Sequence, residues 1–296
     1  MLPERLANVA DLALPLFDVL AWNTLFTTSL HVYTPVSRTF GGSASDDAAT
    51  TFVWDVFFAA VMFGLAGPEH ASSLRARDIA YANIITMVFS RTATGMVPNY
   101  CNGQGGQTCT YDRTEPMVGS WSLQILHSVF GDDWPVQLLF PALLGWNQWT
   151  WDARIAEGSL GAGLPDGKTA LISLGSDGPP LVPLGLNTPH TLSAARYESG
   201  LDNSPQYDGQ LDGNEGYGLG PVRFNNTTNR MELYDVAFTA YHARDGQALL
   251  EMSDAAGTAV AGSSKVAALR KRVTATETAL HRDLFDITTG LYANRL

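Results

Sequence analysis

Basic residues are scarce in this sequence: 18 lysines and arginines stand against 29 aspartates and glutamates, and the formal net charge is −11. A protein that holds a nucleic-acid backbone needs clustered lysines and arginines to replace the counterions of the phosphates. The one dense basic run, KVAALRKR at 265–272, has the pattern of a solvated helix face. The composition therefore argues against a nucleic-acid partner.

Long hydrophobic runs are absent as well. No stretch reaches the roughly 18 apolar residues of a membrane helix, because Asp18 and Asp55 interrupt the two most apolar segments. The N-terminal region contains Glu4, Asp11 and Asp18, and it lacks the basic start and apolar block of a secretory signal peptide. We expect no membrane span, and the sequence indicates no compartment.

Only two cysteines occur, Cys101 and Cys109, at the ends of the segment NGQGGQT. A disulfide across this short loop is geometrically feasible, whereas two thiols are too few for a structural zinc site, which needs four ligands. The sequence leaves open whether the pair is bonded. The histidines are scattered without ligand spacing, and the motifs of phosphate-binding loops, dinucleotide-binding folds and zinc proteases are missing. No metal or cofactor is expected.

The sequence is rich instead in long amphipathic segments that are separated by loops of glycine, proline and aspartate. Strict alternation of apolar and polar residues is nearly absent, so we predict an all-α protein. Helices are predicted at residues 4–27, 50–66, 71–93, 116–131, 135–156, 231–255 and 260–285. Between 158 and 230 the pattern changes to a long loop region ahead of the sixth helix, and such loops are disproportionately functional.

Short blocks of aromatic, carboxylate, asparagine and arginine residues lie outside the regular helical pattern. They read AWNT at 21–24, TPVSR at 34–38, WDVFF at 54–58, VPNY at 97–100, DRTEP at 112–116 and ESGLDNSP at 198–205. Aromatic rings stack on the apolar face of a sugar, while carboxylate, amide and guanidinium groups form directed hydrogen bonds with its hydroxyls. The mixture is typical of a carbohydrate site.

In this order the blocks resemble glycoside hydrolase family 63, which contains processing α-glucosidase I and mannosylglycerate hydrolase. The most specific are ESGLDNSP, DRTEP with the following Gly119, and AWNT with TPVSR. The resemblance extends over nearly the whole chain. It implies an (α/α)6 toroid of twelve helices, with the sugar bound among the loops at its mouth. It also implies hydrolysis with inversion, in which a carboxylic acid and a carboxylate base flank the scissile bond.

The resemblance places the general acid at Asp202. This group must be protonated at the working pH, so we expect burial or a neighbouring carboxylate such as Glu198 to raise its pKa. Positions matched to sugar-binding residues are Asn23, Arg38, Trp54, Asp55, Asn99, Glu115, Arg196, Glu198 and Asn203.

Three of these positions have simpler interpretations that the sequence leaves open. Trp54 lies in the apolar run FVWDVFFAAVMF and could belong to the core. Glu115 could be a first-turn residue that the helix dipole favours, and Asp202 could simply form a turn beside Asn203.

The chain departs from the family pattern in its length. Seven predicted helices fall short of twelve, and only 94 residues follow Asp202, whereas the family's general base lies farther beyond the acid. We therefore expect residues 1–296 to be part of a catalytic barrel that is truncated on the C-terminal side and inactive alone. A shortened gene product that self-associates through the exposed half of the barrel is the other explanation.

Three functional hypotheses follow. The first is an inverting hydrolase of α-glucosides or α-mannosides, of oligosaccharide or glycosylglycerate type, whose base lies beyond this chain. The second is a non-catalytic half-barrel that binds carbohydrate. The third is a helical scaffold whose motifs are coincidental. Under the first two hypotheses the ligand is an oligosaccharide or a small glycoside.

Overall fold

The computed structural model describes residues 24–27, 32–35, 50–66, 76–102, 108–157, 168–177, 191–202, 204–207 and 222–296. It is mostly helical. The long helices are α2 (Val53–Ala66), α3 (Ala76–Phe89), α4 (Gly119–Phe130), α5 (Asp133–Arg154), α7 (Val236–Glu251) and α9 (Ser264–Ala279). Short helical segments are α6 (Leu192–Arg196), η3 (Tyr197–Ser199), η4 (Pro205–Tyr207), α8 (Thr258–Ala261) and η5 (Leu280–Leu284).

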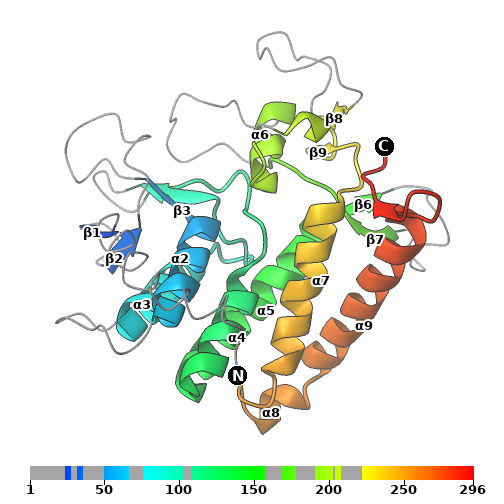
Figure 1. The fold of residues 1–296 in the computed structure, drawn as a ribbon. Helices are drawn as coiled ribbons and strands as arrows, with labels where there is room; N and C mark the ends of the chain where they lie inside the picture. Colours follow the sequence, from blue (N-terminus) through cyan, green and yellow to red (C-terminus); the bar gives the residue numbers. More distant parts are fainter. Residues whose placement is uncertain are drawn as a thin grey trace, which may run out of the picture.

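The helices pack as neighbours along the chain, which is the arrangement of stacked hairpins. Figure 1 shows α4, α5, α7 and α9 side by side, with α2 and α3 against α4 at one edge. The sequence supplies the expected start and stop signals. Asp235 caps α7 by accepting from the backbone N–H of Phe238, and Ser263 caps α9 by accepting from that of Val266. The prediction of an all-α, toroid-like fold is confirmed.

Short antiparallel strands interrupt the helical pattern. β1 (Thr24–Thr27) pairs with β2 (Val32–Pro35), and β3 (Thr50–Phe52), β4 (Tyr100–Asn102) and β5 (Thr108–Cys109) form a three-stranded sheet. Three further hairpins are β6 (Ile155–Glu157) with β7 (Lys168–Ile172), β8 (Phe224–Asn225) with β9 (Arg230–Met231), and β10 (Phe285–Asp286) with β11 (Leu291–Tyr292). Sequence periodicity missed them because each strand has at most five residues, too few to show an alternating pattern.

Several predicted helix boundaries are wrong. The predicted helix at 4–27 has strand β1 in its last four residues, and the residues before Thr24 lie outside the described part of the chain. The helix predicted at 50–66 begins at Val53, because residues 50–52 pair with β4. The helix predicted at 231–255 begins only at Val236, since residues 230–231 pair with β8. In each case tertiary strand pairing overrides the local helical pattern.

The main core lies between the long helices. Phe57 and Phe63 of α2, Leu126 of α4, and Phe140 and Trp146 of α5 are buried together. Burying each large apolar side chain contributes about 1.5–3 kcal/mol. This core holds the helix ends in place, and the site described below lies in the loops at one of those ends.

Polar groups also cross the interface between the central helices. The amide of Asn147 on α5 donates to the carboxylate of Asp245 on α7 at 3.0 Å, and Asp245 also accepts from the backbone N–H of Ser120 on α4. His242, one turn before Asp245, places its Nε2 3.3 Å from the carbonyl oxygen of Asn147. All four residues are buried. Charge on Asp245 or His242 therefore affects the stability of the helix packing.

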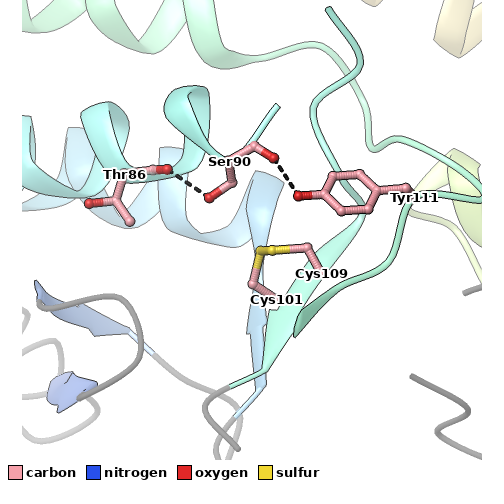
Figure 2. Close-up of a disulfide and its surroundings, with 5 residues drawn as sticks. All are labelled: Thr86, Ser90, Cys101, Cys109 and Tyr111. Carbon is pink, nitrogen blue, oxygen red and sulfur yellow. Dashed lines mark hydrogen bonds between the residues drawn. A yellow bond between two sulfur atoms is a disulfide. The ribbon is translucent and has the colours of Figure 1, made fainter. Parts of the chain in front are cut away.

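Cys101 and Cys109 form a disulfide that joins β4 to β5, where the two residues are direct cross-strand partners. Figure 2 shows the disulfide beside Tyr111, whose hydroxyl donates to the carbonyl oxygen of Ser90 at 2.7 Å. The Ser90 hydroxyl in turn donates to the carbonyl oxygen of Thr86 in α3. Both cysteines are buried. The question that the sequence left open is thus answered by a disulfide that fixes the loop leading toward Glu115.

Candidate active site

The predicted site residues lie in the loops at one end of the helices. Trp54 and Asp55 occupy the first turn of α2, Glu115 lies in the loop before α4, and Asp202 follows η3. Contacts join these segments: Gly200 lies against Trp54 and Pro116, and the backbone N–H of Thr114 donates to Glu198. Segments that are far apart in the sequence therefore meet here.

Three acidic groups lie near one another there, and like charge raises the pKa of two of them. Asp55 keeps an exposed surface, but partial burial of its carboxyl raises its pKa, and the charge of Asp202 raises it further. The pKa of Glu115 lies well above its ordinary value, because the group is buried and because Asp55 and Asp202 add like charge. Charges that shift a pKa in this way generally lie within a few ångströms of the group. Asp55, Glu115 and Asp202 therefore form one electrostatic cluster.

The pKa of Asp202 is raised from its ordinary value, which is the direction that we expected for a general acid. Its side chain remains exposed on one side, but partial burial of the carboxyl raises the pKa, while Arg113 and Arg196 lower it. The cause is thus burial, one of the two causes that we expected. Glu198, the neighbouring carboxylate that we expected to contribute, has no such effect on Asp202. The turn interpretation also holds, since the N–H of Ser204 donates to the carbonyl oxygen of Leu201 across Asp202.

Glu115 is the least exposed of the three acidic residues in the cluster, with 3% of its surface accessible. Its Oε1 accepts from the amide of Asn99 at 2.6 Å, and the same amide reaches the carbonyl oxygens of Thr114 and Tyr197. Helix α4 begins only at Gly119, so Glu115 is not a first-turn residue, and that simpler interpretation is wrong. Asn99 and Glu115, two predicted site residues, are in direct contact.

Glu198 is fully buried and serves as the junction of three segments. Its Oε1 accepts from the backbone N–H of Thr114 at 2.9 Å, and its Oε2 accepts from Arg154 Nε at 2.7 Å and from the N–H of Gly175 at 2.6 Å. Burial raises the pKa of Glu198, although Arg154 and the two amides work in the opposite direction. Because protein donors engage both oxygens, the geometry favours a positioning role for Glu198 over direct contact with a sugar.

Arg154 is the main partner of this junction. Its guanidinium is fully buried, donates to Asp177 at 2.5 Å as well as to Glu198, and lies over the ring of Trp149. The two carboxylates raise the pKa of Arg154, which keeps it charged. Sequence reasoning missed this residue, because at the end of α5 it looks like an ordinary last-turn cation.

Arg113 is a second residue that sequence reasoning missed. It is buried, donates to the adjacent Asp112 at 2.7 Å and lies over the ring of Tyr197. Its charge lowers the pKa of both Glu115 and Asp202. The signal was available, since Arg113 lies inside the quoted block DRTEP. Arg113 therefore partly offsets the effects that raise the pKa of these two groups.

Trp54 packs beside the turn that precedes Asp202. Its indole is partly buried against the core and lies edge-on to Phe58. Gly200, with a positive φ of 68°, fits against the indole and against Pro116. The core interpretation of Trp54 is therefore partly right, and the same ring supports the backbone of the acid-bearing segment. The guanidinium of Arg196 donates to the carbonyl oxygen of Ser204 and so braces this segment from the other side.

Asn23, Arg38 and Asn203 lie outside the described residues, so their predicted sugar-binding roles stay predictions. Within the described part of the chain, no group of three or more His, Cys, Asp or Glu side chains has a metal-binding arrangement. No helix of that part is long and apolar enough to cross a membrane. A groove of about 690 Å³ beside α9, rimmed by Arg270, Lys271 and Arg282, shares no residue with the carboxyl cluster.

Comparisons with known proteins agree with this fold. The chain is similar to the GH63 mannosylglycerate hydrolase of Thermus thermophilus, solved in complex with glucose, with a TM-score of 0.63, 16% identity and 96% of this chain covered. The same hydrolase in complex with Tris and D-glycerate gives a TM-score of 0.60, 17% identity and 96% coverage of this chain. An uncharacterized conserved protein from the same organism gives 0.60, 15% and 96%.

The chain spans 66–67% of the length of these solved structures. A comparison with curated proteins finds no match. The family model of the mannosylglycerate hydrolase MGH1-like glycoside hydrolase domain matches residues 54–296, a range that includes Asp55, Glu115 and Asp202. As the sequence blocks predicted, this chain belongs to the MGH1-like glycoside hydrolase family of mannosylglycerate hydrolase relatives.

Proposed function

We propose that the chain carries the acid side of an inverting site that hydrolyses α-glucosides or α-mannosides, of oligosaccharide or glycosylglycerate type. Asp202 is the general acid, and Trp54, Asp55, Asn99, Glu115 and Arg196 line or support the sugar site together with Asn23, Arg38 and Asn203. The observation that carries the proposal is the raised pKa of Asp202 in a cluster with two further carboxyl groups. The glucose and D-glycerate complexes of the structural relatives support a small glycoside as ligand.

The proposed chemistry assigns the proton of Asp202 to the glycosidic oxygen as the bond from that oxygen to the anomeric carbon breaks. Water attacks the opposite face of the sugar and transfers a proton to a carboxylate base. The raised pKa of Asp202 favours the protonated form that this step requires. We propose that the base is supplied by a segment outside these 296 residues, so that the isolated chain hydrolyses its substrate slowly or not at all.

Glu198 has a different proposed role. Its carboxylate fixes the loop before Glu115, the end of β7 and the end of α5 relative to each other, four residues before Asp202. We propose that Glu198 and Arg154 are positioning residues, which set the geometry of the acid without contacting the sugar.

A test of the acid role does not need the missing base. Azide is a small anion that attacks an anomeric carbon without transferring a proton, so it replaces both the water and the base. With an α-glucoside or α-mannoside whose leaving group needs protonation, azide should yield the β-glycosyl azide. The Asp202→Asn variant should lose this product, while it should still convert the α-glycosyl fluoride, whose leaving group needs less help from an acid.

Two outcomes would contradict the proposal. Azide product from Asp202→Asn with the demanding leaving group would exclude Asp202 as the acid. Binding of glucose or mannose without any azide product, from glycoside or fluoride, would favour the non-catalytic carbohydrate-binding half-barrel.

A further inference from the structure

Two buried glutamates of the site, Glu198 and Glu115, differ in how the protein satisfies their charge. Glu198 receives three donors, and one of them is the guanidinium of Arg154. Glu115 receives one donor, the neutral amide of Asn99, on its Oε1. Its Oε2 is buried, and no donor from the described part of the chain reaches it. A carboxylate in this position lacks the hydrogen bonds that make a buried charge tolerable.

The cations near Glu115 are committed to other groups. Arg113 pairs with Asp112 and lies over Tyr197, and Arg154 pairs with Glu198 and Asp177. Among the described residues no ion pair involves Glu115. A salt bridge that would hold Glu115 in its charged form is therefore not formed in this part of the chain.

The other groups that act on Glu115 oppose its ionisation. Asp55 on α2, Asp202 after η3 and Glu198 in η3 each add negative charge, and only Arg113, in the same loop as Glu115, adds positive charge. The side-chain amide of Asn99 donates to Glu115 and also to the carbonyl oxygen of Tyr197, and neither of these groups carries a charge. Burial is the largest influence, and the pKa of Glu115 is raised well above its ordinary value. Burial and like charge act in the same direction.

We propose that Glu115 is a neutral carboxylic acid at neutral pH and that its Oε2–H donates a hydrogen bond to a sugar hydroxyl. This role rests on the proposed sugar site and makes Glu115 a binding residue whose function depends on its proton. A neutral sugar oxygen would supply the acceptor that the described part of the chain does not offer to Oε2. The proton on Glu115 also removes one negative charge from the neighbourhood of Asp202, so the proposed acid is not forced to hold its own proton too tightly to release it.

Protonation is tested without any sugar. The infrared carbonyl stretch of a protonated carboxyl is absent from ionised carboxylates, so a difference spectrum between the chain and Glu115→Gln isolates the group. At about pH 8, roughly two units above the pKa of about 6 of Asp245, that buried aspartate is ionised and does not interfere. The chain should show a protonated-carboxyl band that Glu115→Gln lacks. Glu232→Gln, which changes an exposed glutamate of the β9 end, should keep the band.

The donor role is tested by sugar binding. Affinity for glucose or mannose, measured by calorimetry, should fall about two- to tenfold as rising pH removes the Glu115 proton, which is the value of one neutral hydrogen bond. Glutamine keeps an N–H donor at every pH, so Glu115→Gln should bind without this loss. The Glu115→Ala variant should bind weakly throughout.

The outcomes separate the two proposals. A missing band overturns the neutral state of Glu115, whatever the enzyme does. A band that disappears as the pH rises, together with the same pH dependence of binding over that range in the chain and in Glu115→Gln, overturns the donor role. Absence of binding to either sugar while the band is present overturns the donor role and the sugar site together, and leaves the protonation result standing.

Discussion

Gly200 lies against the indole of Trp54 so closely that a Cβ atom at this position would come within 2.8 Å of two indole carbons and 3.0 Å of Pro116 Cγ. Its φ of 68° lies in the left-handed region, where a side chain is strained. This glycine therefore links the first turn of α2 to the segment that carries Asp202. The contact explains why the block ESGLDNSP contains a glycine two residues before the aspartate.

Gly200→Ala should destabilise the protein for two reasons, which a matched variant separates. The left-handed backbone costs about 1–2 kcal/mol, and displacing the indole adds about 1–3 kcal/mol. Gly131→Ala meets the first cost alone, because Gly131 has a φ of 71° and no described atom lies within 4 Å of the place that its Cβ would take. Urea unfolding of both variants measures the difference. Equal losses would show that the indole contact carries no strain.

Arg154→Met should cost about 3–5 kcal/mol, because it leaves the fully buried carboxylate of Glu198 without its cation. The double variant Arg154→Met/Glu198→Gln should recover part of this loss, since the unpaired charge is then gone. Arg244→Met is the control for a solvent-accessible ion pair: Arg244 is partly exposed and Glu251 is exposed, so its effect should stay within about 1 kcal/mol. A small effect of Arg154→Met in urea unfolding would contradict a structural junction at Glu198.

Asp245 and His242, one turn apart on α7, should give opposite pH dependences of stability. Burial raises the pKa of Asp245 to about 6, so its contribution is largest at low pH and is lost as the pH rises from about 4 to 6. Burial lowers the pKa of His242 to about 4, so its contribution is present above about pH 6.5 and is lost as the pH falls toward 4. Between about pH 4 and 6 the two effects nearly cancel in the wild type.

Asp245→Asn should remove the pH-dependent contribution of Asp245 to stability and leave that of His242. The stability of the variant should then fall, relative to wild type, by up to about 3 kcal/mol as the pH is lowered from 6 to 4, because only His242 still titrates. His242→Gln should change the pH dependence in the opposite direction. Urea unfolding across this range tests both variants, and parallel curves for wild type and Asp245→Asn would refute the raised pKa of Asp245.

Reduction of the disulfide should lower stability by about 2–3 kcal/mol, the chain-entropy value for a loop of this length. Because both cysteines are buried, mild reductant should act slowly on the folded protein. The measurement is thermal unfolding with and without a phosphine reductant. The Cys101→Ser/Cys109→Ser variant is the control, and it should melt at the same temperature under both conditions. Equal melting of wild type in the two conditions after complete reduction would show that the disulfide adds nothing.

Much of the fold followed from local patterns. The helices α4 and α5 were predicted within three residues at each end, because long amphipathic segments with polar flanks have few alternatives. The predicted helix boundaries are wrong at residues that form short strands. Strand pairing involves residues 24–27, 50–52 and 230–231. Their partners lie outside the local helical pattern, so that pattern gives no sign of the pairing.

The candidate site shows the same division. The blocks around Trp54, Glu115 and Asp202 were visible because they lie in short, unusual runs of residues. Arg154 was not visible, since a single arginine at a helix end has no distinctive neighbours. Asn99 and Glu115 were both chosen from the sequence, yet their contact at 2.6 Å follows only from the meeting of two loops.

The sequence by itself determined the all-α class, the family and the identity of the candidate acid, because these depend on periodicity and on the order of short motifs. Only the tertiary structure decided what each carboxyl group does. Glu198 and Glu115 are both glutamates in recognisable blocks, but Arg154 and two backbone amides from distant segments hold the charge of the first. Glu115 has a single amide beside two other carboxyl groups. The charge of a buried acid depends on which donors the fold brings to it, and those donors are far away in the chain.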